Sequence, residues 1–295
     1  MLLKSRLQEQ VQKNNAKWEI IEQDYILSWV LEGISSIAPL KNNLVFKGGT
    51  ALKKVYFGNY RFSQDLDFSV LNRENIENDL ENLISQACQA AEFRIQELGN
   101  NVELKCERYT EKNPHPEGQQ AFIIRARFPW QREFLTTVYA EVSFGEIILL
   151  PPHNKKIIHP YGEKLEGELL VYPLEEILGE KIRALLQFAK KLHERGWGRS
   201  RVRDYYDLWR IFKDYYKDLN LEILPNLVKH KCFHKNVSFN EIEDIFQEKL
   251  MANADKEWTA WLSDVVRELP EKQVVIEELR YILREIFGLI PPENS

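Results

Sequence analysis

Two aspartates stand one residue apart inside an otherwise apolar, strand-like stretch, Asp65-Leu66-Asp67-Phe68. Because alternate side chains of a strand point to the same side, Asp65 and Asp67 share one face while their apolar neighbours enter the core. Two carboxylates on one face repel each other and are costly to desolvate. A solvated strand edge also alternates in this way, but Asp is depleted in strands, and a bound Mg²⁺ would offset the cost. The pattern therefore favours a divalent-cation site.

A pair of glycines precedes these carboxylates, in the run Lys47-Gly48-Gly49-Thr50 that follows the apolar residues 44–46. Glycine lets the backbone approach a phosphate closely, and the backbone N–H groups bind the anion if a helix begins there. A phosphate cradle beside metal-binding carboxylates is what the transfer of a nucleotidyl or phosphoryl group requires.

A third carboxylate lies in the alternating segment 136–144, where Tyr139, Glu141 and Ser143 share one face. If this segment pairs beside residues 66–70, Glu141 stands next to Asp67. It could then bind metal or accept the proton of an attacking hydroxyl. A surface glutamate on a half-exposed strand would give the same pattern.

Lys181 lies on the apolar stripe of a helix predicted from Leu174 onward. A lysine in that position either extends to water or reaches an anion, of which a triphosphate is the obvious one. Asp204, next to Arg203 in a second helical segment, could hold Lys181 or Arg203 near the phosphates. It is equally suited to be a helix N-cap or a first-turn acid.

Charge and composition limit the partners. The chain has 295 residues, 44% of them hydrophobic and 29% charged, with a formal net charge of −5. A nucleic acid must therefore meet a local basic patch, and residues 190–203, with Trp197 among the basic side chains, are the densest one, although an ordinary solvated loop looks similar. The three cysteines have no paired spacing, which favours a reducing cytosol. We expect no signal peptide and no membrane span.

The periodicity predicts an α+β protein. Helical patterns cover residues 2–37 and 72–98, and strand patterns cover 44–46, 66–70, 102–109, 121–128 and 136–144. A connecting stretch, 146–173, precedes an almost wholly helical remainder. We expect a small mixed sheet with flanking helices in domain 1–155 and a helical C-terminal half in domain 156–295 that contributes to the functional cleft.

Four motifs in order resemble the AbiEii/AbiGii-type toxin nucleotidyltransferases, within the nucleotidyltransferase-like (DNA polymerase β-type) superfamily. The motifs are Lys47-Gly48-Gly49-Thr50-Ala51-Leu52, Arg61-Phe62-Ser63-Gln64-Asp65-Leu66-Asp67-Phe68, Glu180-Lys181-Ile182-Arg183-Ala184-Leu185 and Arg203-Asp204-Tyr205-Tyr206-Asp207-Leu208. The resemblance covers residues 20–212, and no motif is evident in residues 213–295.

The resemblance implies a cytoplasmic toxin of a toxin–antitoxin or abortive-infection system. Such an enzyme transfers a nucleoside monophosphate from NTP to RNA, expected to be the 3′ end of tRNA, and so blocks translation; a cognate antitoxin is a further expected partner. The implied site residues are Gly48, Gly49, Thr50, Lys181 and Arg203 for the nucleotide, Asp65, Asp67 and Glu141 for Mg²⁺ or Mn²⁺, and Lys181 and Asp204 for the third and fourth motifs.

Two other functions remain open. The acceptor could be a protein side chain, as in AMPylating transferases. The chain could also be a non-catalytic binding module with a relic site. The retained charges of Asp65, Asp67 and Lys181 argue against a relic, because a silenced site has no reason to keep buried charge.

Overall fold

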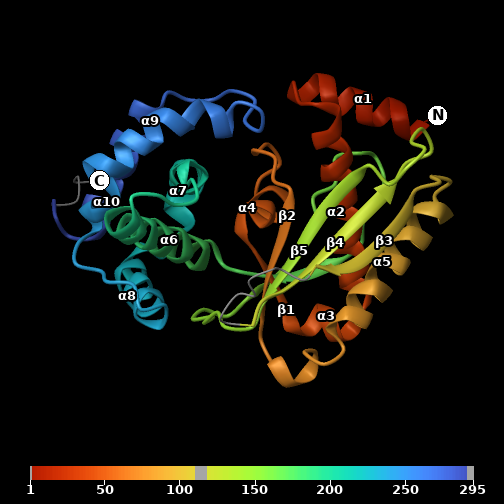
Figure 1. Cartoon of the computed structure of the whole chain (residues 1–295), viewed down its shortest axis with the longest axis horizontal. Coiled ribbons are helices and arrows are strands. Elements are labelled where there is room, and N and C mark those ends of the chain that lie inside the picture. Colours follow the sequence, from red (N-terminus) through yellow and green to blue (C-terminus); the bar gives the residue numbers. More distant parts are fainter. Residues whose placement is uncertain (1, 110–117, 291–295) are drawn as a thin grey trace. The chain divides into compact units, whose positions relative to one another are not determined.

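The computed structural model describes residues 2–109 and 118–290. The chain divides into two compact units, Met1–Tyr172 and Pro173–Ser295. Figure 1 shows the elements of the first unit in red to green and those of the second in green to blue.

The first unit begins with α1 (Leu2–Asn14), α2 (Trp18–Ser36) and α3 (Ala38–Asn43). The helical pattern over residues 2–37 is divided between α1 and α2, because the chain breaks after α1. Asn15 has a φ of 49°, in the left-handed region that asparagine tolerates better than most residues. A change of chain direction at this residue separates the two helical patterns.

A seven-stranded mixed sheet forms the centre of the first unit, in the order β3-β4-β5-β2-β1-β7-β6. Two neighbouring pairs are parallel, β2 with β5 and β1 with β7, and the others are antiparallel. The strands are β1 (Leu44–Lys47), β2 (Asp65–Val70), β3 (Glu103–Tyr109), β4 (Gln120–Arg127), β5 (Thr136–Ser143), β6 (His153–Lys156) and β7 (Glu168–Val171). The predicted mixed sheet is confirmed.

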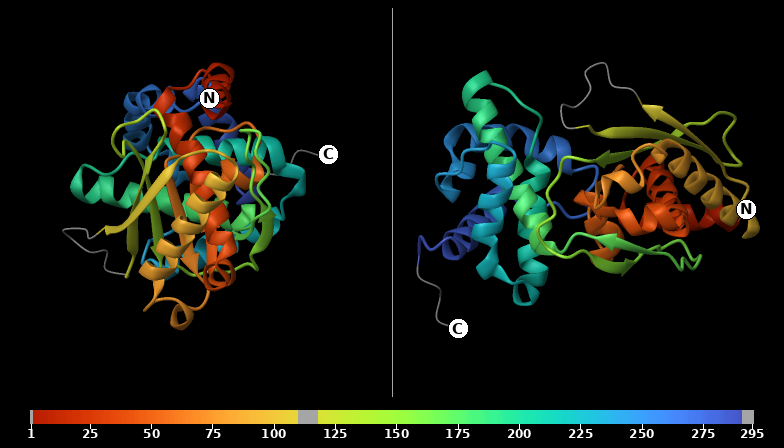
Figure 2. Two further views of the ribbon diagram at one scale, coloured as in Figure 1. Left: turned by 90° about the vertical axis from the view of Figure 1, so that its right-hand side faces the viewer. Right: turned by 90° about the horizontal axis from the view of Figure 1, so that it is seen from below.

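Helices α2 and α5 (Leu80–Glu97) pack against each other and cover one face of this sheet (Figures 1 and 2). The side chains on that face, among them Leu66, Phe68 and Val142, are buried. Helix α5 starts eight residues later than expected, after a 3-10 turn, Arg73–Asn75. Asn72 caps this turn, since its Oδ1 accepts the Glu74 N–H at 3.2 Å.

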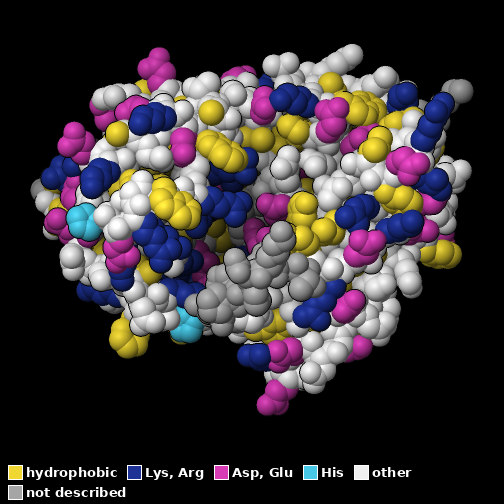
Figure 3. Space-filling model, viewed as in Figure 1, with side chains coloured by type: hydrophobic (Ala, Val, Ile, Leu, Met, Phe, Trp, Pro, Cys, Tyr) yellow, Lys and Arg dark blue, Asp and Glu magenta, His cyan; other side chains and the backbone are white. Residues whose placement is uncertain are grey.

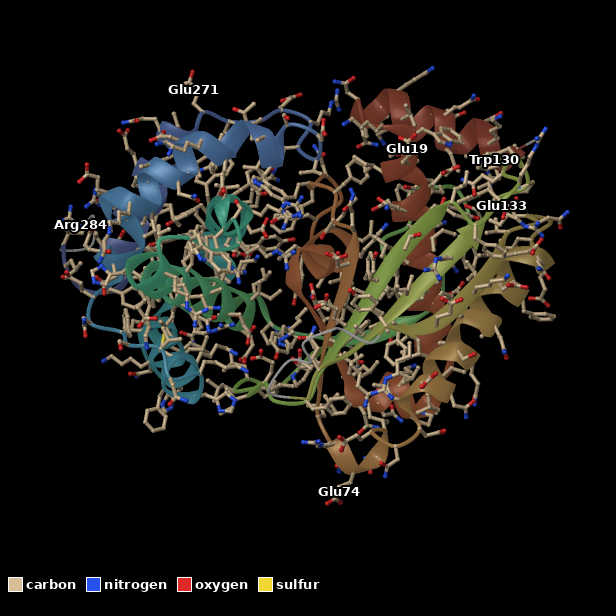
Figure 4. The ribbon with its side chains drawn as sticks, viewed as in Figure 1. Glu19, Glu74, Trp130, Glu133, Glu271 and Arg284 are labelled. Atoms are coloured by element: carbon tan, nitrogen blue, oxygen red, sulfur yellow. The ribbon has the colours of Figure 1, made fainter. Side chains whose placement is uncertain are left out.

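The beginning of α2 is attached to the β4–β5 connection by tryptophans. The Trp18 and Trp130 rings meet edge to face, 5.7 Å apart. Both indole N–H groups donate to Glu22 Oε1 at 2.7 Å. Figure 4 labels Trp130 and Glu19 at this end of the unit. These contacts fix the helix under the sheet.

The sequence patterns missed β6 and β7, which lie in the expected connecting stretch. In β7, Leu170 and Val171 pair in parallel with Val45 and Phe46 of β1. Because these strands complete the sheet, the first unit extends to Tyr172 instead of ending at residue 155.

The second unit is helical in its described part. Its helices are α6 (Leu174–Arg195), α7 (Val202–Tyr215), α8 (Leu224–His234), α9 (Glu248–Leu262) and α10 (Lys272–Ile286), with 3-10 turns at Tyr216–Asp218, Leu221–Ile223 and Ile242–Phe246. Helix α6 packs on α7, α8 and α9. It ends at Gly196, whose φ of 76° suits a helix C-terminus. Across residues 2–109 and 118–290, no helix is long and apolar enough to cross a membrane.

Candidate active site

Three charged side chains form a row across neighbouring strands of the first unit. Lys47 of β1 is the register partner of Asp67 in β2, and Asp67 is the partner of Glu141 in β5. Registered residues on adjacent strands point to the same face, so the three side chains stand side by side. The pairing expected to place Glu141 next to Asp67 is therefore present.

Asp65, Asp67 and Glu141 lie on the sheet face opposite α2 and α5, and each is half-buried. The alternating residues Leu66 and Phe68 are buried. Glu141 is oriented by Gln119, whose Nε2 donates to its Oε2 at 2.5 Å. The face thus presents oxygen donors to a ligand while the rest of each strand belongs to the core.

These carboxylates fit a hard divalent cation by the chemistry of their donors. Among the residues that the structure describes, no group of three or more His, Cys, Asp or Glu is arranged to hold a metal ion. Mg²⁺ commonly binds through one or two carboxylates plus phosphate oxygens of the substrate. The arrangement therefore suits a cation that binds together with a nucleotide, and the three-carboxylate site stays a prediction.

The glycine pair lies directly against this row. Gly48 has a φ of +79°, and a Cβ added there would collide with the Asp67 carboxylate. Helical backbone begins at Gly48, as α4 (Gly48–Ala51), and continues as a π-helix (Leu52–Tyr56). Only glycine therefore lets the chain turn into helix this close to Asp67.

Thr50 has a structural contact beside the phosphate role that the family resemblance implies. Its side chain is fully buried, and Oγ1 donates to the backbone carbonyl of Asp65 at 2.5 Å. This bond ties the start of the helix to the start of β2. The hydroxyl is thus used to align the glycine pair with the carboxylates, and phosphate binding by Thr50 stays a prediction.

The sequence interpretation gave no role to Arg61 or Lys47. The buried Arg61 guanidinium lies against Gly49, where an added Cβ would collide with it. Lys47 Nζ lies 3.9 Å from Glu146 Oε1 and 5.7 Å from the centre of the Tyr172 ring. The sequence held a signal for each of these residues. Lys47 stands next to the glycines of the first motif, and Arg61 stands shortly before Asp65 in the second motif.

In the second unit, Lys181 of α6 is held by two carboxylates of α7. Its Nζ lies 2.9 Å from Asp204 Oδ1 and 2.6 Å from Asp207 Oδ2. The Lys181 side chain is 9% exposed and that of Asp207 is 0% exposed. Lys181 therefore does not extend into open water. Asp207 was not assigned from the sequence, although its spacing of three residues from Asp204 places both on one helix face.

Asp204 has both of the features that the sequence left as alternatives, a contact with Lys181 and a position in the first turn of a helix. It lies in the first turn of α7, and it binds Lys181 and also Arg201, whose Nη1 is 3.3 Å from Oδ2. Burial raises the pKa of Asp204, but the charges of Lys181 and Arg201 outweigh burial and hold that pKa below its ordinary value. Arg203, one residue earlier, stacks over the Trp261 ring of α9 at 5.5 Å.

The expected basic patch begins in the last turns of α6 and continues into the loop after it. Lys190, Lys191, Arg195 and Arg199 are exposed, and Trp197 is 72% exposed. Figure 3 shows Lys and Arg side chains gathered on this face over α6 and α7.

The fold is that of a nucleotidyltransferase toxin. The chain is similar to MenT4, nucleotidyltransferase toxin Rv2826c from Mycobacterium tuberculosis H37Rv, with a TM-score of 0.57 and 18% identity over 94% of this chain and 86% of that one. Among curated proteins, none matches this sequence.

The family model "Nucleotidyl transferase AbiEii toxin, Type IV TA system" matches residues 29–285, and the chain belongs to this family. The resemblance seen in the four motifs is therefore confirmed. The protein is a nucleotidyltransferase, and the non-catalytic alternative is set aside.

Proposed function

We propose that this protein is a cytoplasmic toxin that transfers a nucleoside monophosphate from NTP to an RNA end, the 3′ end of tRNA being the expected acceptor, and thereby blocks translation. A cognate antitoxin is its expected regulator. The observation that carries this proposal is the row Lys47–Asp67–Glu141 with the Gly48 backbone against Asp67. It combines metal-binding oxygens and a phosphate-accepting turn on one sheet face.

The reaction needs one bond formed and one broken. The acceptor hydroxyl attacks the α-phosphorus of the NTP, and the bond to pyrophosphate breaks. Glu141, oriented by Gln119, is placed to accept the hydroxyl proton or to help hold a cation. Asp65 and Asp67 would hold Mg²⁺ or Mn²⁺ together with the substrate phosphates, and such a cation would neutralise developing charge there.

The phosphates are assigned to backbone and cationic groups. The Gly48–Gly49 turn offers close approach of N–H groups, with Arg61 against Gly49 as a further cation. Lys181 and Arg203 are the proposed nucleotide-binding residues of the helical unit. Asp204 positions Lys181 through the 2.9 Å contact.

RNA binding is assigned to the exposed basic residues at the end of α6 and in the loop that follows it. A chain with a net charge of −5 repels a polyanion, so productive binding requires this local reversal of sign. Phosphate contacts release counterions, and the exposed Trp197 offers a ring on which a base can stack.

Labelled NTPs, supplied one at a time with total RNA, test the acceptor. We expect label on RNA of tRNA size, lost on chelation of divalent ions and restored by Mg²⁺ or Mn²⁺. Label on protein instead of RNA would refute the RNA acceptor and favour the protein-modifying alternative.

A double variant, Arg195→Ala with Arg199→Ala, tests the basic patch. We expect weaker RNA binding and a flatter dependence on salt, with NTP binding unchanged. Arg201 is left intact because it contacts Asp204. The control, Lys249→Ala with Arg267→Ala, removes the same charge from exposed residues elsewhere in the unit. Equal effects of both double variants would show that bulk charge, not this patch, governs binding.

A further inference from the structure

Two cysteines that are distant in sequence meet in the first unit. Cys88 lies on α5 and Cys106 on β3, and this helix packs on this strand. Contacts on either side of the two cysteines align the helix with the strand: the Leu104 N–H donates to Glu92 Oε2 at 2.6 Å, and Arg108 Nη1 lies 3.8 Å from Glu81 Oε2. The lack of paired spacing in the sequence therefore does not keep these thiols apart.

The two thiols differ in access. Cys88 is 3% exposed, whereas Cys106 is partly exposed. Cys106 lines an open cavity of about 430 Å³ together with Glu81, Ser85 and Arg108. A small reagent can therefore reach Cys106 first, while Cys88 stands behind it.

The pKa values of the two thiols shift in directions that agree with this difference in access. A hydrogen bond with Cys88 holds the pKa of Cys106 below its ordinary value, although partial burial and the carboxylates of Glu81 and Glu107 oppose this. The same hydrogen bond, with burial, raises the pKa of Cys88. Cys106, the more accessible thiol, is therefore the one that we expect to react first.

We propose that Cys88 and Cys106 form a redox-active pair that a hydroperoxide converts reversibly into an intramolecular disulfide. This inference does not depend on the proposed function. The disulfide would join α5 to β3, which is the edge strand of the sheet.

The oxidation balances in two steps. The Cys106 thiolate attacks a peroxide oxygen and the O–O bond breaks, which gives a sulfenic acid and a leaving hydroxide (or alkoxide). That leaving group takes up the proton that the Cys106 thiol released and departs as water (or an alcohol). The Cys88 sulfur then attacks the Cys106 sulfur; the S–O bond breaks, and the leaving hydroxide departs as water with the Cys88 proton. The two sulfurs must come to about 2 Å from each other, and a dithiol reductant reverses the reaction.

The test uses the full chain, reduced, exposed to hydrogen peroxide, alkylated and analysed by intact mass and peptide mapping. We expect the loss of two hydrogen atoms, a crosslinked Cys88–Cys106 peptide and an alkylated Cys232. Cys232 is the internal control, because it is buried and burial raises its pKa to about 11. Reduction by dithiothreitol should restore the starting mass.

Two variants assign the roles. Cys88→Ser should accumulate a sulfenic acid at Cys106 that a 1,3-dione probe traps, and Cys106→Ser should show neither product at residue 88. The wild-type mass measurement needs no variant to fold. Thiols that both stay reduced, or a disulfide to Cys232 or between two chains, would overturn the proposal.

Discussion

Two lysines of the helical unit have nearly the same surroundings but different expected roles. Lys181 Nζ lies between Asp204 and Asp207, and Lys231 Nζ lies 2.6 Å from Glu176 Oε1 and 2.9 Å from Glu180 Oε1. Lys231 is 2% exposed. Only Lys181 is a proposed nucleotide ligand. Comparing variants at the two lysines therefore separates the effect of a buried cation on stability from its effect on activity.

Methionine at either position keeps an unbranched side chain but removes the charge. Removing one partner of a buried ion pair costs about 3–5 kcal/mol, because the remaining charge is left uncompensated. At each site one carboxylate keeps a further cation, Asp204 with Arg201 at 3.3 Å and Glu180 with Arg183 at 3.8 Å. The other carboxylate, Asp207 or Glu176, is fully buried. We therefore expect Lys181→Met and Lys231→Met to lose similar amounts of stability within that range.

Urea unfolding followed by circular dichroism measures the stability, and labelled-NTP transfer per folded molecule measures the activity. We expect Lys181→Met to lose about 100-fold or more in rate, as when one charge-stabilising donor is removed, and Lys231→Met to keep its rate. Lys181→Arg should recover part of the stability. Full activity in Lys181→Met would refute phosphate contact by Lys181, and unchanged stability in both variants would refute the ion-pair reasoning.

Three further outcomes are expected. Asp67→Asn should abolish transfer and the growth arrest caused by expression, with an unchanged circular dichroism spectrum; an arrest that persists would indicate a binding mechanism. Gly48→Ala should cost about 1–2 kcal/mol in thermal unfolding for its positive φ, and activity as well, whereas the control Gly99→Ala, with the same φ of +79° but open space, should cost stability alone. The pKa of Asp204 is depressed in the folded chain, so the stabilisation that this carboxylate gives is present above its ordinary pKa of 3.8 and is lost as the pH falls below that value. Acid titration of Lys181→Met should therefore show a smaller loss of stability than wild type.

The carboxylate face could be predicted because its signal is local. The alternation of residues 65–68 and 136–144 places Asp67 and Glu141 on the strand face opposite the apolar side chains, whichever strands they pair with. The sequence alone could not show which strand pairs with β2, because strand pairing and register depend on long-range contacts. Lys47 beside Asp67 follows from that register and could not be read from spacing.

The missed elements have physical reasons as well. Strands β6 and β7 have four residues each, too few for a period-two pattern to be distinguished from a loop. Strand β7 pairs with β1, which lies more than 100 residues earlier in the chain, and β6 pairs with β7. The roles of Thr50 and Asp207 likewise depend on partners that the fold supplies, a backbone carbonyl and a buried ammonium.

The charges around Lys181 limit how it can act on a nucleotide. Lys181 and Arg201 carry two positive charges and Asp204 and Asp207 two negative ones, so these four groups sum to zero. A neutral group exerts little attraction beyond contact distance in salt. Under the proposed function, long-range attraction therefore comes from the exposed basic residues at the end of α6 and in the loop after it, and a phosphate shares Lys181 with its two carboxylates. Hence Lys181→Met should lower the transfer rate more than NTP affinity, whereas the Arg195 and Arg199 replacements should act chiefly on RNA affinity.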